Sequence, residues 1–421
     1  MKFDTPKNEN YAAVILRVSH IKPIPKRDRI ESIPLYGHNA VVAKGWNVGD
    51  LGVFFPAEVQ LSEQYARENN MHRHGDRNAD PGQSGYLEDS RRVKAIKLGD
   101  ERSNALFMPL SSLASFGVKP EDFREGDTFD TLNGQEVCRK YVVREPGTPN
   151  NQAPKDRSGD RVDRKVFPEH IDTSNYWRSA EKVAGMGRVV VTQKLHGTSI
   201  RVGRVPVRRS LSRLERLAAR FGVRVQTHEY ASVYGSRKVI KDANTVGQNH
   251  FYAQDIWTQK GRELDGILPD GWIAYGELIG WTPDGAPIQK GYTYELPPRQ
   301  SKIYIYRIAV VNASGVSVDL SQSAMVEFCK NHGLNYVPVL WAGNPADFRV
   351  DDWMDQNYAN AGFTNAVAAG NGVVDEGVVV RGEGLAPVLL KAKAPQFLEH
   401  ETSLLDNGTE DLESAEAAQA A

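Results

Sequence analysis

Cysteine is almost missing from this sequence of 421 residues, and so is any long apolar run. The two cysteines, Cys138 and Cys329, lie far apart and outside any Cys-x-x-Cys pair. We therefore expect neither a disulfide framework nor a thiolate zinc site. No stretch of about 18 apolar residues occurs, and the first residues, MKFDTPKNENY, are polar. The sequence predicts neither a membrane-spanning helix nor a secretory signal, and it favours a cytoplasmic protein.

A strong net charge is also lacking, since the formal value is −1. The last 21 residues nevertheless hold six acids and no Lys or Arg, so residues 1–400 carry a surplus of +5. This surplus is modest. Binding of a polyanion would have to depend on local basic clusters rather than on the field of the whole molecule.

The length and composition favour two folded domains. The shares of hydrophobic and charged residues, 40% and 25%, are those of ordinary globular proteins. From Tyr11 to about Val143, β-branched runs such as AAVILRV and LGVFFPAEV alternate with Gly, Pro and Asn, which predicts an all-β module over residues 1–143. A five-stranded barrel of the oligonucleotide-binding (OB) type suits its length, and an SH3-like barrel is the alternative.

Three segments have little to bury. Residues 64–90 interrupt the β module with a polar stretch that we interpret as a surface loop; its His72-x-His74 pair is a poor metal candidate, because no cysteine and few carboxylates accompany it. Residues 144–165 combine Pro, Gly, Asn and mixed charge, which is typical of an exposed linker. The acidic, alanine-containing residues 401–421 are predicted to be disordered.

Residues 166–400 alternate strand-like runs, such as RVVVTQ and KIYIYRIAVV, with helical stretches at 209–221 and 321–331. This predicts an α+β domain with antiparallel sheets. Six short motifs follow one another in it. KLHGTS places Lys194 at the end of a hydrophobic strand, before a turn at Gly197, and YGSRK, YGELIG, KIYIYRI, DEGVVVR and LLKAK come later. Each motif is short enough to arise by chance, but their order argues against coincidence.

In this order the motifs resemble those of the covalent nucleotidyltransferases, the DNA ligases, RNA ligases and capping enzymes. The superfamily pattern is K-x-D/H-G, S-R, a strand-borne Glu, an aromatic strand, E-G-hydrophobic and K-x-K, and the match spans about Phe167 to Lys393. The histidine in KLHGTS, His196, is similar to the motif of the phage and trypanosome-editing RNA ligases, which reads K-x-H-G-T. The N-terminal β module resembles instead the RNA ligases with an N-terminal OB domain known from a protist and from phages, in which Asp usually stands at position 196.

The resemblance implies that Lys194 is the nucleophile that accepts AMP from ATP. A lysine is protonated at neutral pH, so its amine needs burial or neighbouring cations to become reactive. Lys391, Lys393 and a divalent metal, Mg²⁺ or Mn²⁺, would supply these cations. The same charges would neutralise the α-phosphate under attack and the departing pyrophosphate.

Two glutamates are implied as metal residues. Carboxylates in a phosphate-binding cleft repel the substrate unless a cation lies between them, and Mg²⁺ suits carboxylates that act through its waters. By resemblance, Glu376 orients the metal's waters, and Glu277 contacts the ribose hydroxyls or assists the metal. A solvated strand glutamate is the alternative for each.

Five further residues are implied in ATP binding. Tyr306 offers an aromatic face to adenine, with Tyr304 on the same face of the strand. The guanidinium of Arg237 suits contacts with the nucleotide sugar and the RNA end. Gln193, directly before Lys194, would accept a hydrogen bond from the adenine amino group. The five are Gln193, His196, Gly197, Arg237 and Tyr306, and the segment Phe167–Asn175 resembles a lead-in that closes over the nucleotide pocket of phage-type ligases.

The resulting hypothesis is an ATP-dependent RNA ligase that joins RNA 3′-hydroxyl and 5′-phosphate ends through lysyl-AMP and RNA-adenylate, as in RNA repair. We expect a monomer, in the host cytoplasm if a phage encodes it. The β module would bind RNA beside the break, with Trp46, Phe54 and Phe55 as candidate aromatics. The basic amphipathic helix near 209–221 either contacts RNA phosphates or packs with a solvated cationic face.

Two alternatives remain from the sequence. A GTP-dependent capping enzyme shares the lysine chemistry, but it usually carries its barrel after the nucleotidyltransferase domain. A catalytically inactive RNA-binding protein of the same fold is the other, and the intact Lys194, Glu277, Glu376, Lys391 and Lys393 argue against it. The end structure of the RNA, the tolerance of DNA and the metal preference are not encoded in these motifs.

Overall fold

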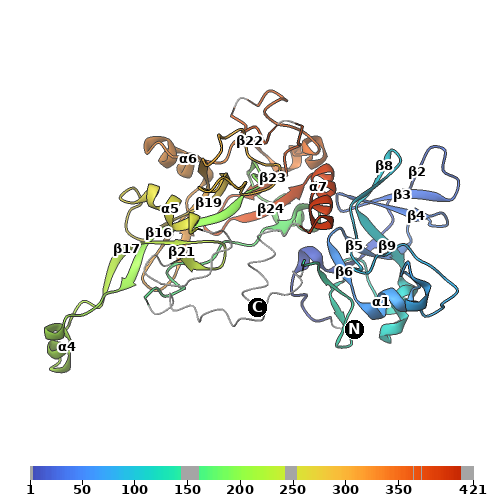
Figure 1. Ribbon diagram of the computed structural model, residues 1–421, viewed down its shortest axis with the longest axis horizontal. Coiled ribbons are helices and arrows are strands. Elements are labelled where there is room, and N and C mark those ends of the chain that lie inside the picture. Colours follow the sequence, from blue (N-terminus) through green and yellow to red (C-terminus); the bar gives the residue numbers. More distant parts are fainter. Residues whose placement is uncertain (1–2, 144–160, 242–253, 364, 371, 409–421) are drawn as a thin grey trace. The chain divides into compact units, whose positions relative to one another are not determined.

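The structure is a computed structural model, and it describes residues 3–143, 161–241, 254–363, 365–370 and 372–408 (Figure 1). Most of the predicted linker and residues 409–421 of the predicted tail lie outside these ranges. None of the described helices has both the length and the apolar character that crossing a membrane requires. The chain forms two compact units: unit 1 consists of Met1–Val143, Ser174–Arg178 and Ala392–Glu410, and unit 2 of Arg144–Thr173, Ser179–Lys391 and Asp411–Ala421.

Unit 1 is built from short antiparallel strands. One sheet has the order β10-β1-β5-β9, a second has the order β2-β3-β4, and β6–β13, β7–β8 and β11–β12 form pairs. These sheets are separate and open over the described residues, so the predicted OB-type barrel is not confirmed. The strands span Ala13–Arg17 (β1), Lys22–Pro23 (β2), Ile30–Leu35 (β3), His38–Ala43 (β4), Leu51–Pro56 (β5), Val59–Leu61 (β6), Ile96–Leu98 (β7), Glu101–Ser103 (β8), Ala105–Pro109 (β9), Thr128–Phe129 (β10), Thr131–Leu132 (β11), Gln135–Glu136 (β12) and Cys138–Lys140 (β13).

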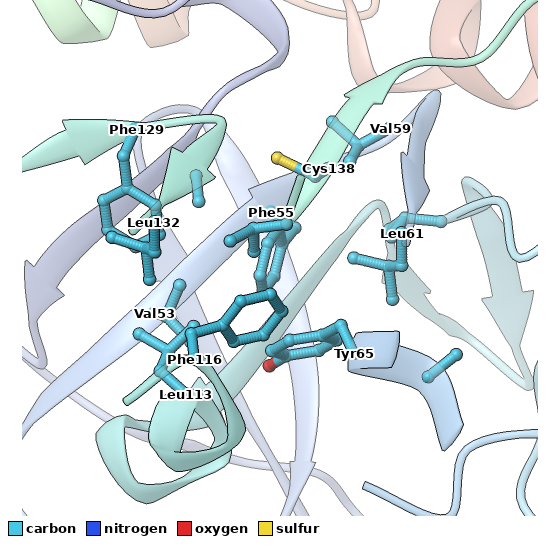
Figure 2. Close-up of a cluster of buried hydrophobic side chains, with 14 of the residues drawn as sticks. Val53, Phe55, Val59, Leu61, Tyr65, Leu113, Phe116, Phe129, Leu132 and Cys138 are labelled. Carbon is cyan, nitrogen blue, oxygen red and sulfur yellow. The ribbon is translucent and has the colours of Figure 1, made fainter. Parts of the chain in front are cut away.

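The central sheet of unit 1 buries both of its faces, because alternate residues of a strand point to opposite sides. Val53 and Phe55 of β5 point into one cluster (Figure 2), and Phe54 points into the other. Both phenylalanines are fully buried, so the hypothesis that they stack on RNA is wrong. Trp46 is partly buried and packs against Phe107, with ring centroids 4.6 Å apart.

The polar stretch 64–90 is folded rather than a solvated loop, which corrects that prediction. It contains most of helix α1 (Glu63–Glu68), and Tyr65, Met71 and Leu87 are buried in the cluster of Figure 2. The imidazole of His72 is buried 3.2 Å from the carboxylate of Glu63. Among the described residues no group of three His, Cys, Asp or Glu side chains is placed to hold a metal.

Helix α7 (Pro395–Asp406) belongs to unit 1, so the predicted disordered tail is wrong for residues 401–406. The hydroxyl of Thr402 donates to Glu58 over 2.5 Å and accepts from the backbone N–H of Ala95 over 3.0 Å. The buried guanidinium of Arg92 pairs with Glu58 at 3.0 Å and with Asp406. These buried polar contacts fix α7 in unit 1. The amino-acid composition of the tail does not reveal such contacts.

Unit 2 contains two antiparallel sheets, as predicted. A six-stranded sheet has the order β18-β17-β16-β19-β20-β21, and the strands β24-β23-β15-β22 are neighbours in the second. The strands span Val189–Gln193 (β15), Thr198–Arg208 (β16), His228–Gly235 (β17), Ile240–Lys241 (β18), Trp272–Gly280 (β19), Ser301–Val311 (β20), Ser317–Asp319 (β21), Val339–Gly343 (β22), Gly377–Gly382 (β23) and Val388–Lys393 (β24).

Two helices of unit 2 cover one face of the six-stranded sheet. Helices α5 (Ile256–Gly261) and α6 (Gln322–Asn331) bury Trp257 and Met325 against Ile200, Leu278 and Ile305 of the sheet. The opposite face carries Val205, Tyr275 and Ala309, which pack with Val162, Val166 and Phe167. The remaining α-helices are Tyr176–Ser179 (α2), Glu181–Ala184 (α3) and Arg213–Arg220 (α4). The six-stranded sheet is therefore covered on both faces.

Candidate active site

The predicted nucleophile lies in the turn that joins the two sheets of unit 2. β15 ends at Gln193 and β16 begins at Thr198, so the turn consists of residues 194–197. The backbone N–H of Lys194 donates to the carbonyl of Gly377 over 2.9 Å, which continues the pairing of β15 with β23. A Cβ atom on Gly197 would lie 2.3 Å from the carbonyl oxygen of Leu278. Only glycine allows β16 to approach β19 this closely.

Lys194 forms an ion pair with Glu376, at the start of β23. Its Nζ lies 2.8 Å from Oε1 of Glu376, and the other carboxylate oxygen lies 3.5 Å from Nδ1 of His196. The lysine side chain is 20% exposed and the glutamate side chain 2%. The lysine side chain is thus partly exposed, whereas the glutamate beside it is almost completely buried.

Glu277 approaches the same turn from β19. Its Oε1 accepts from the backbone N–H of Gly197 over 2.9 Å, and its backbone pairs with Tyr304 of β20. The amide of Gln289 donates to the carbonyl of Gly197 over 2.9 Å. Both glutamates that are predicted to bind metal therefore contact the turn of residues 194–197. Glu376 contacts the side chains of Lys194 and His196, and Glu277 contacts the backbone of Gly197.

Two tyrosines that no sequence motif predicts, Tyr292 and Tyr294, also contact the turn. The backbone N–H of His196 donates to the hydroxyl of Tyr294 over 2.5 Å, and its ring meets that of Tyr292 edge-on with centroids 5.0 Å apart. Burial raises the pKa of Tyr294 well above its ordinary value, so this hydroxyl stays neutral. The segment GYTYE around these residues carries no motif that would reveal the contact.

Gln193 has a different position from the one predicted. Its side chain is buried; the amide donates to Asp375 over 2.6 Å and to the carbonyl of Val367 over 2.7 Å, and its oxygen accepts from the N–H of Val367 over 2.9 Å. Asp375 also accepts from the N–H of Tyr358 over 2.7 Å. Gln193 thus secures the segment before β23 rather than presenting its amide to adenine. Its partners are 174 and 182 residues away, which sequence spacing could not reveal.

Tyr306 and Arg237 both contact the lead-in segment Phe167–Asn175. The hydroxyl of Tyr306 and Nδ1 of the buried His170 are 2.5 Å apart. The guanidinium of Arg237 pairs with the exposed carboxylate of Asp172 at 2.6 Å. The segment thus reaches the aromatic strand and the Ser-Arg motif, as the resemblance leads us to expect of a lead-in to the pocket.

The two lysines of the last motif differ in their surroundings. Lys391 lies on β24, which neighbours β23, and β23 in turn pairs with β15. Adjacent strands lie about 4.8 Å apart, so the backbone of β24 lies roughly 10 Å from that of β15. Lys393 falls in unit 1, where its Nζ pairs with Glu401 at 2.6 Å and lies over the ring of Phe397.

Comparisons with known proteins agree with this arrangement. Residues 187–393, which contain all six motifs, match the family model for RNA ligase. Among solved structures, a Naegleria gruberi RNA ligase with pyrophosphate is 18% identical, covers 94% of this chain and 99% of its own, and has a TM-score of 0.59. A variant of that ligase with ATP and Mn is 17% identical, covers 93% and 99%, and has a TM-score of 0.56. No curated protein matches the chain.

At these identities the structural likeness supports the fold over nearly the whole chain, while the family model covers the region that carries the turn of Lys194, both glutamates and both motif lysines. Over residues 187–393 the chain therefore matches the RNA ligase family, and it shares the fold of the Naegleria gruberi RNA ligase over nearly its whole length.

Proposed function

We propose that this protein is an ATP-dependent RNA ligase that forms lysyl-AMP on Lys194. The observation that carries the proposal is the partly exposed side chain of Lys194, whose Nζ lies 2.8 Å from the buried carboxylate of Glu376, in a turn that Glu277 contacts. An amine at the end of a strand, with acids from two other strands around it, suits covalent attack on a nucleotide phosphate. The resemblance implies that cations activate this lysine, whereas the structure shows an acid, Glu376, in contact with its amine.

The first step forms a bond between Nζ of Lys194 and the α-phosphorus of ATP and breaks the bond from that phosphorus to the bridging oxygen, so pyrophosphate leaves. The amine must give up a proton before it attacks. A carboxylate in contact favours the charged form of an amine. Lys194 therefore has to move away from Glu376, or pass its proton on, when ATP binds. AMP then passes to the RNA 5′-phosphate, and the RNA 3′-hydroxyl displaces it to form the phosphodiester.

The residues around the turn suit a divalent cation that is shared with the substrate. Mg²⁺ in phosphoryl-transfer sites takes one or two carboxylates together with waters and substrate phosphates. Glu376 and Glu277 provide two carboxylates, and His196 lies 3.5 Å from Glu376. Over the described residues no three His, Cys, Asp or Glu side chains are arranged to hold a metal by themselves. When bound, Mg²⁺ or Mn²⁺ would supply positive charge against the phosphates.

The nucleotide base is assigned to the aromatic strand. In this proposal Tyr306, whose hydroxyl contacts His170, offers its ring to adenine. Arg237 and Lys391 are the proposed cations for the sugar and phosphates. The Naegleria ligase was solved with ATP and Mn and, in another variant, with AMP and Mn, which supports the same ligands here.

The RNA side of the proposal comes from the family. The proposed substrates are RNA 3′-hydroxyl and 5′-phosphate ends, and unit 1 would bind the RNA beside the break. With Phe54 and Phe55 buried, any stacking on RNA by unit 1 requires other side chains. A monomeric state and a cytoplasmic location remain predictions, as do the domain boundaries at 143, 165 and 400.

Mass spectrometry of the protein after incubation with ATP and Mg²⁺ tests the proposal. We expect a mass increase of one AMP, located on the peptide that contains Lys194, and none in the Lys194→Ala variant. Incubation with labelled GTP in place of ATP distinguishes a GTP-dependent capping enzyme from an ATP-dependent ligase. A sealing assay on RNA with a 5′-phosphate then tests the complete reaction. Absence of any adduct on the wild-type protein would favour the inactive RNA-binding alternative.

A further inference from the structure

The hairpin of β16 and β17 carries a segment that is uncovered over its whole length. We call residues 208–229 the arm; it contains α4 and lies beyond the paired strands (Figure 1). No residue of the arm is buried. The strands of the hairpin pair from Arg201 and Gly235 to Arg208 and His228, so the arm is attached through a continuous two-stranded ladder. It is a projection of unit 2 and not part of its core.

Helix α4 has an apolar face that no described residue covers. Leu214, Leu217 and Phe221 follow at spacings of three and four, which places them on one side of the helix. Leu214 is 79% exposed and Phe221 80%. An isolated helix of eight residues is marginal in water. Its fixed contacts are at the N-terminus, where Ser212 and Glu215 form a capping box and Glu215 pairs with Arg209 at 2.5 Å.

The same helix carries a basic face beside the apolar one. The arm contains six arginines against two glutamates, and Glu215 is already engaged with Arg209 and Ser212. Four arginines are exposed and make no side-chain hydrogen bond or ion pair in the described part of the chain: Arg213, Arg216, Arg220 and Arg224. In a chain whose net charge is −1, this is a local cationic surface.

Both strands of the hairpin connect the arm to the candidate active site. β16 begins at Thr198, directly after the turn of Lys194, and β17 ends at Gly235, two residues before Arg237. The eleven residues of β16 extend roughly 35 Å. A ligand that contacts both the arm and the nucleophile must therefore be long, as a nucleic acid strand is.

We propose that the arm binds the RNA that flanks the break, with the four arginines on phosphates and the apolar face against sugars and bases. This inference rests on the proposed function. Charge complementarity favours RNA over a protein partner or a lipid surface, because the substrate of this enzyme is a polyanion and the strands of the arm lead to its reactive end. Apolar side chains next to arginines contact nucleic acid in the same way where they insert beside base steps.

The test compares three full-length proteins on a nicked RNA duplex. The arm variant R213Q/R216Q/R220Q/R224Q keeps good helix formers and removes four charges. The control variant R188Q/R262Q/K330Q/R349Q removes four exposed charges elsewhere in unit 2. Affinity is measured by fluorescence anisotropy over a salt series. Each phosphate contact contributes about 0.7 to 0.9 to the slope of log affinity against log salt, so we expect the slope of the arm variant to fall by about 3 and that of the control variant to fall less.

Duplex length sharpens the test. With flanks of about 16 base pairs, the span of a compact double-strand RNA-binding domain, the arm variant should bind at least about tenfold more weakly than the wild type. With flanks of about 5 base pairs, too short to reach along the hairpin, the two proteins should bind alike. A second variant, L214S/L217S/F221S, should weaken binding to the long duplex while keeping the wild-type salt slope.

Two results would overturn the proposal: an arm variant with the affinity and slope of the wild type, or intact RNA binding together with loss of self-association or of binding to anionic vesicles, which would assign the arm to a protein or lipid partner. Lysyl-AMP formation requires no RNA, so each variant is also assayed with ATP alone. Loss of the adduct from the wild-type protein contradicts the proposed function, whereas an intact adduct with unchanged RNA binding contradicts only the role of the arm.

Discussion

Nζ of Lys194 and Oε1 of Glu376 are 2.8 Å apart, and the lysine side chain is 20% exposed whereas the glutamate side chain is 2% exposed. A carboxylate at this distance favours the charged form of an amine. If Lys194 is the nucleophile, as we propose, the pair must separate before the amine attacks the nucleotide.

Replacing Glu376 with Gln tests this pairing. The glutamine amide has nearly the same shape as the glutamate carboxylate but carries no charge. Any contribution of the carboxylate of Glu376 to metal binding would therefore be lost. We expect the rate of lysyl-AMP formation to fall about 10- to 100-fold, the usual cost of altering groups around a catalytic metal, and the Mg²⁺ concentration for half-maximal rate to rise. The exposed Glu263, which pairs with Lys260 at 2.5 Å, provides the control Glu263→Gln. A normal rate and normal Mg²⁺ dependence in Glu376→Gln would rule out this role.

Two substitutions of Glu277 distinguish the role of its charge from the role of its hydrogen bond to Gly197. In Glu277→Gln the side-chain oxygen can still accept from the N–H of Gly197, but no charge remains; in Glu277→Ala both are lost. An unsatisfied backbone N–H costs about 1 to 3 kcal/mol, so the alanine variant should lose this much stability in urea unfolding, while the glutamine variant should not. If adenylation also drops in the glutamine variant, Glu277 acts through its charge; if it stays at the wild-type rate, Glu277 only positions the turn.

Gly197→Ala should disrupt the turn, because the new methyl group would lie 2.3 Å from the backbone oxygen of Leu278. The clash displaces either the turn or β19. We expect adenylation to fall at least about tenfold, in line with the sensitivity of catalysis to displacements of about 1 Å. Gly185→Ala is the matched control, since no atom lies within 4 Å of a Cβ at that position. Equal adenylation rates for the two variants would contradict the structural role of Gly197.

Asp375 predicts a defined pH dependence of stability. Burial raises its pKa to about 6, so the folded state resists its ionisation. Its contribution to stability is complete below about pH 4 and is lost as the pH rises through 6, and the loss amounts to roughly 3 kcal/mol. Asp375→Asn removes this dependence. The difference in unfolding free energy between variant and wild type should therefore shift in favour of the variant between pH 4 and pH 7.

The exposed variant Asp352→Asn provides the baseline for this comparison, because the Asp352 side chain is largely in solvent. Asparagine at 375 can accept from only one of the two N–H groups that Asp375 serves, those of Gln193 and Tyr358. A constant cost of about 1 to 3 kcal/mol at every pH is therefore expected on top of the shift. A difference that does not change with pH would show that Asp375 does not titrate in this range.

The sequence predicted the parts of the site that are local or ordered along the chain. Short motifs predict Lys194, Gly197 and Glu376, and β-branched runs predict the strands β5 and β15. Gln193 was misassigned because its partners come from a distant segment, and Phe54 and Phe55 were misassigned because exposure depends on the second face of a sheet. Tyr292 and Tyr294 have no local signal at all. Such contacts depend on tertiary packing, which residue type alone does not encode.

The short connection between β24 and α7 restricts how this protein can be dissected. Only Ala394 separates Lys393 from Pro395, the first residue of α7, and α7 is held by Glu58, Arg92 and Ala95. Deleting the first 143 residues would leave buried Thr402 and Leu398 without the surfaces they pack against. A fragment without residues 1–143 would thus either expose an unsupported α7 or, if cut before α7, leave Lys393 without Glu401 and Phe397, so the N-terminal unit cannot be removed as an independent accessory.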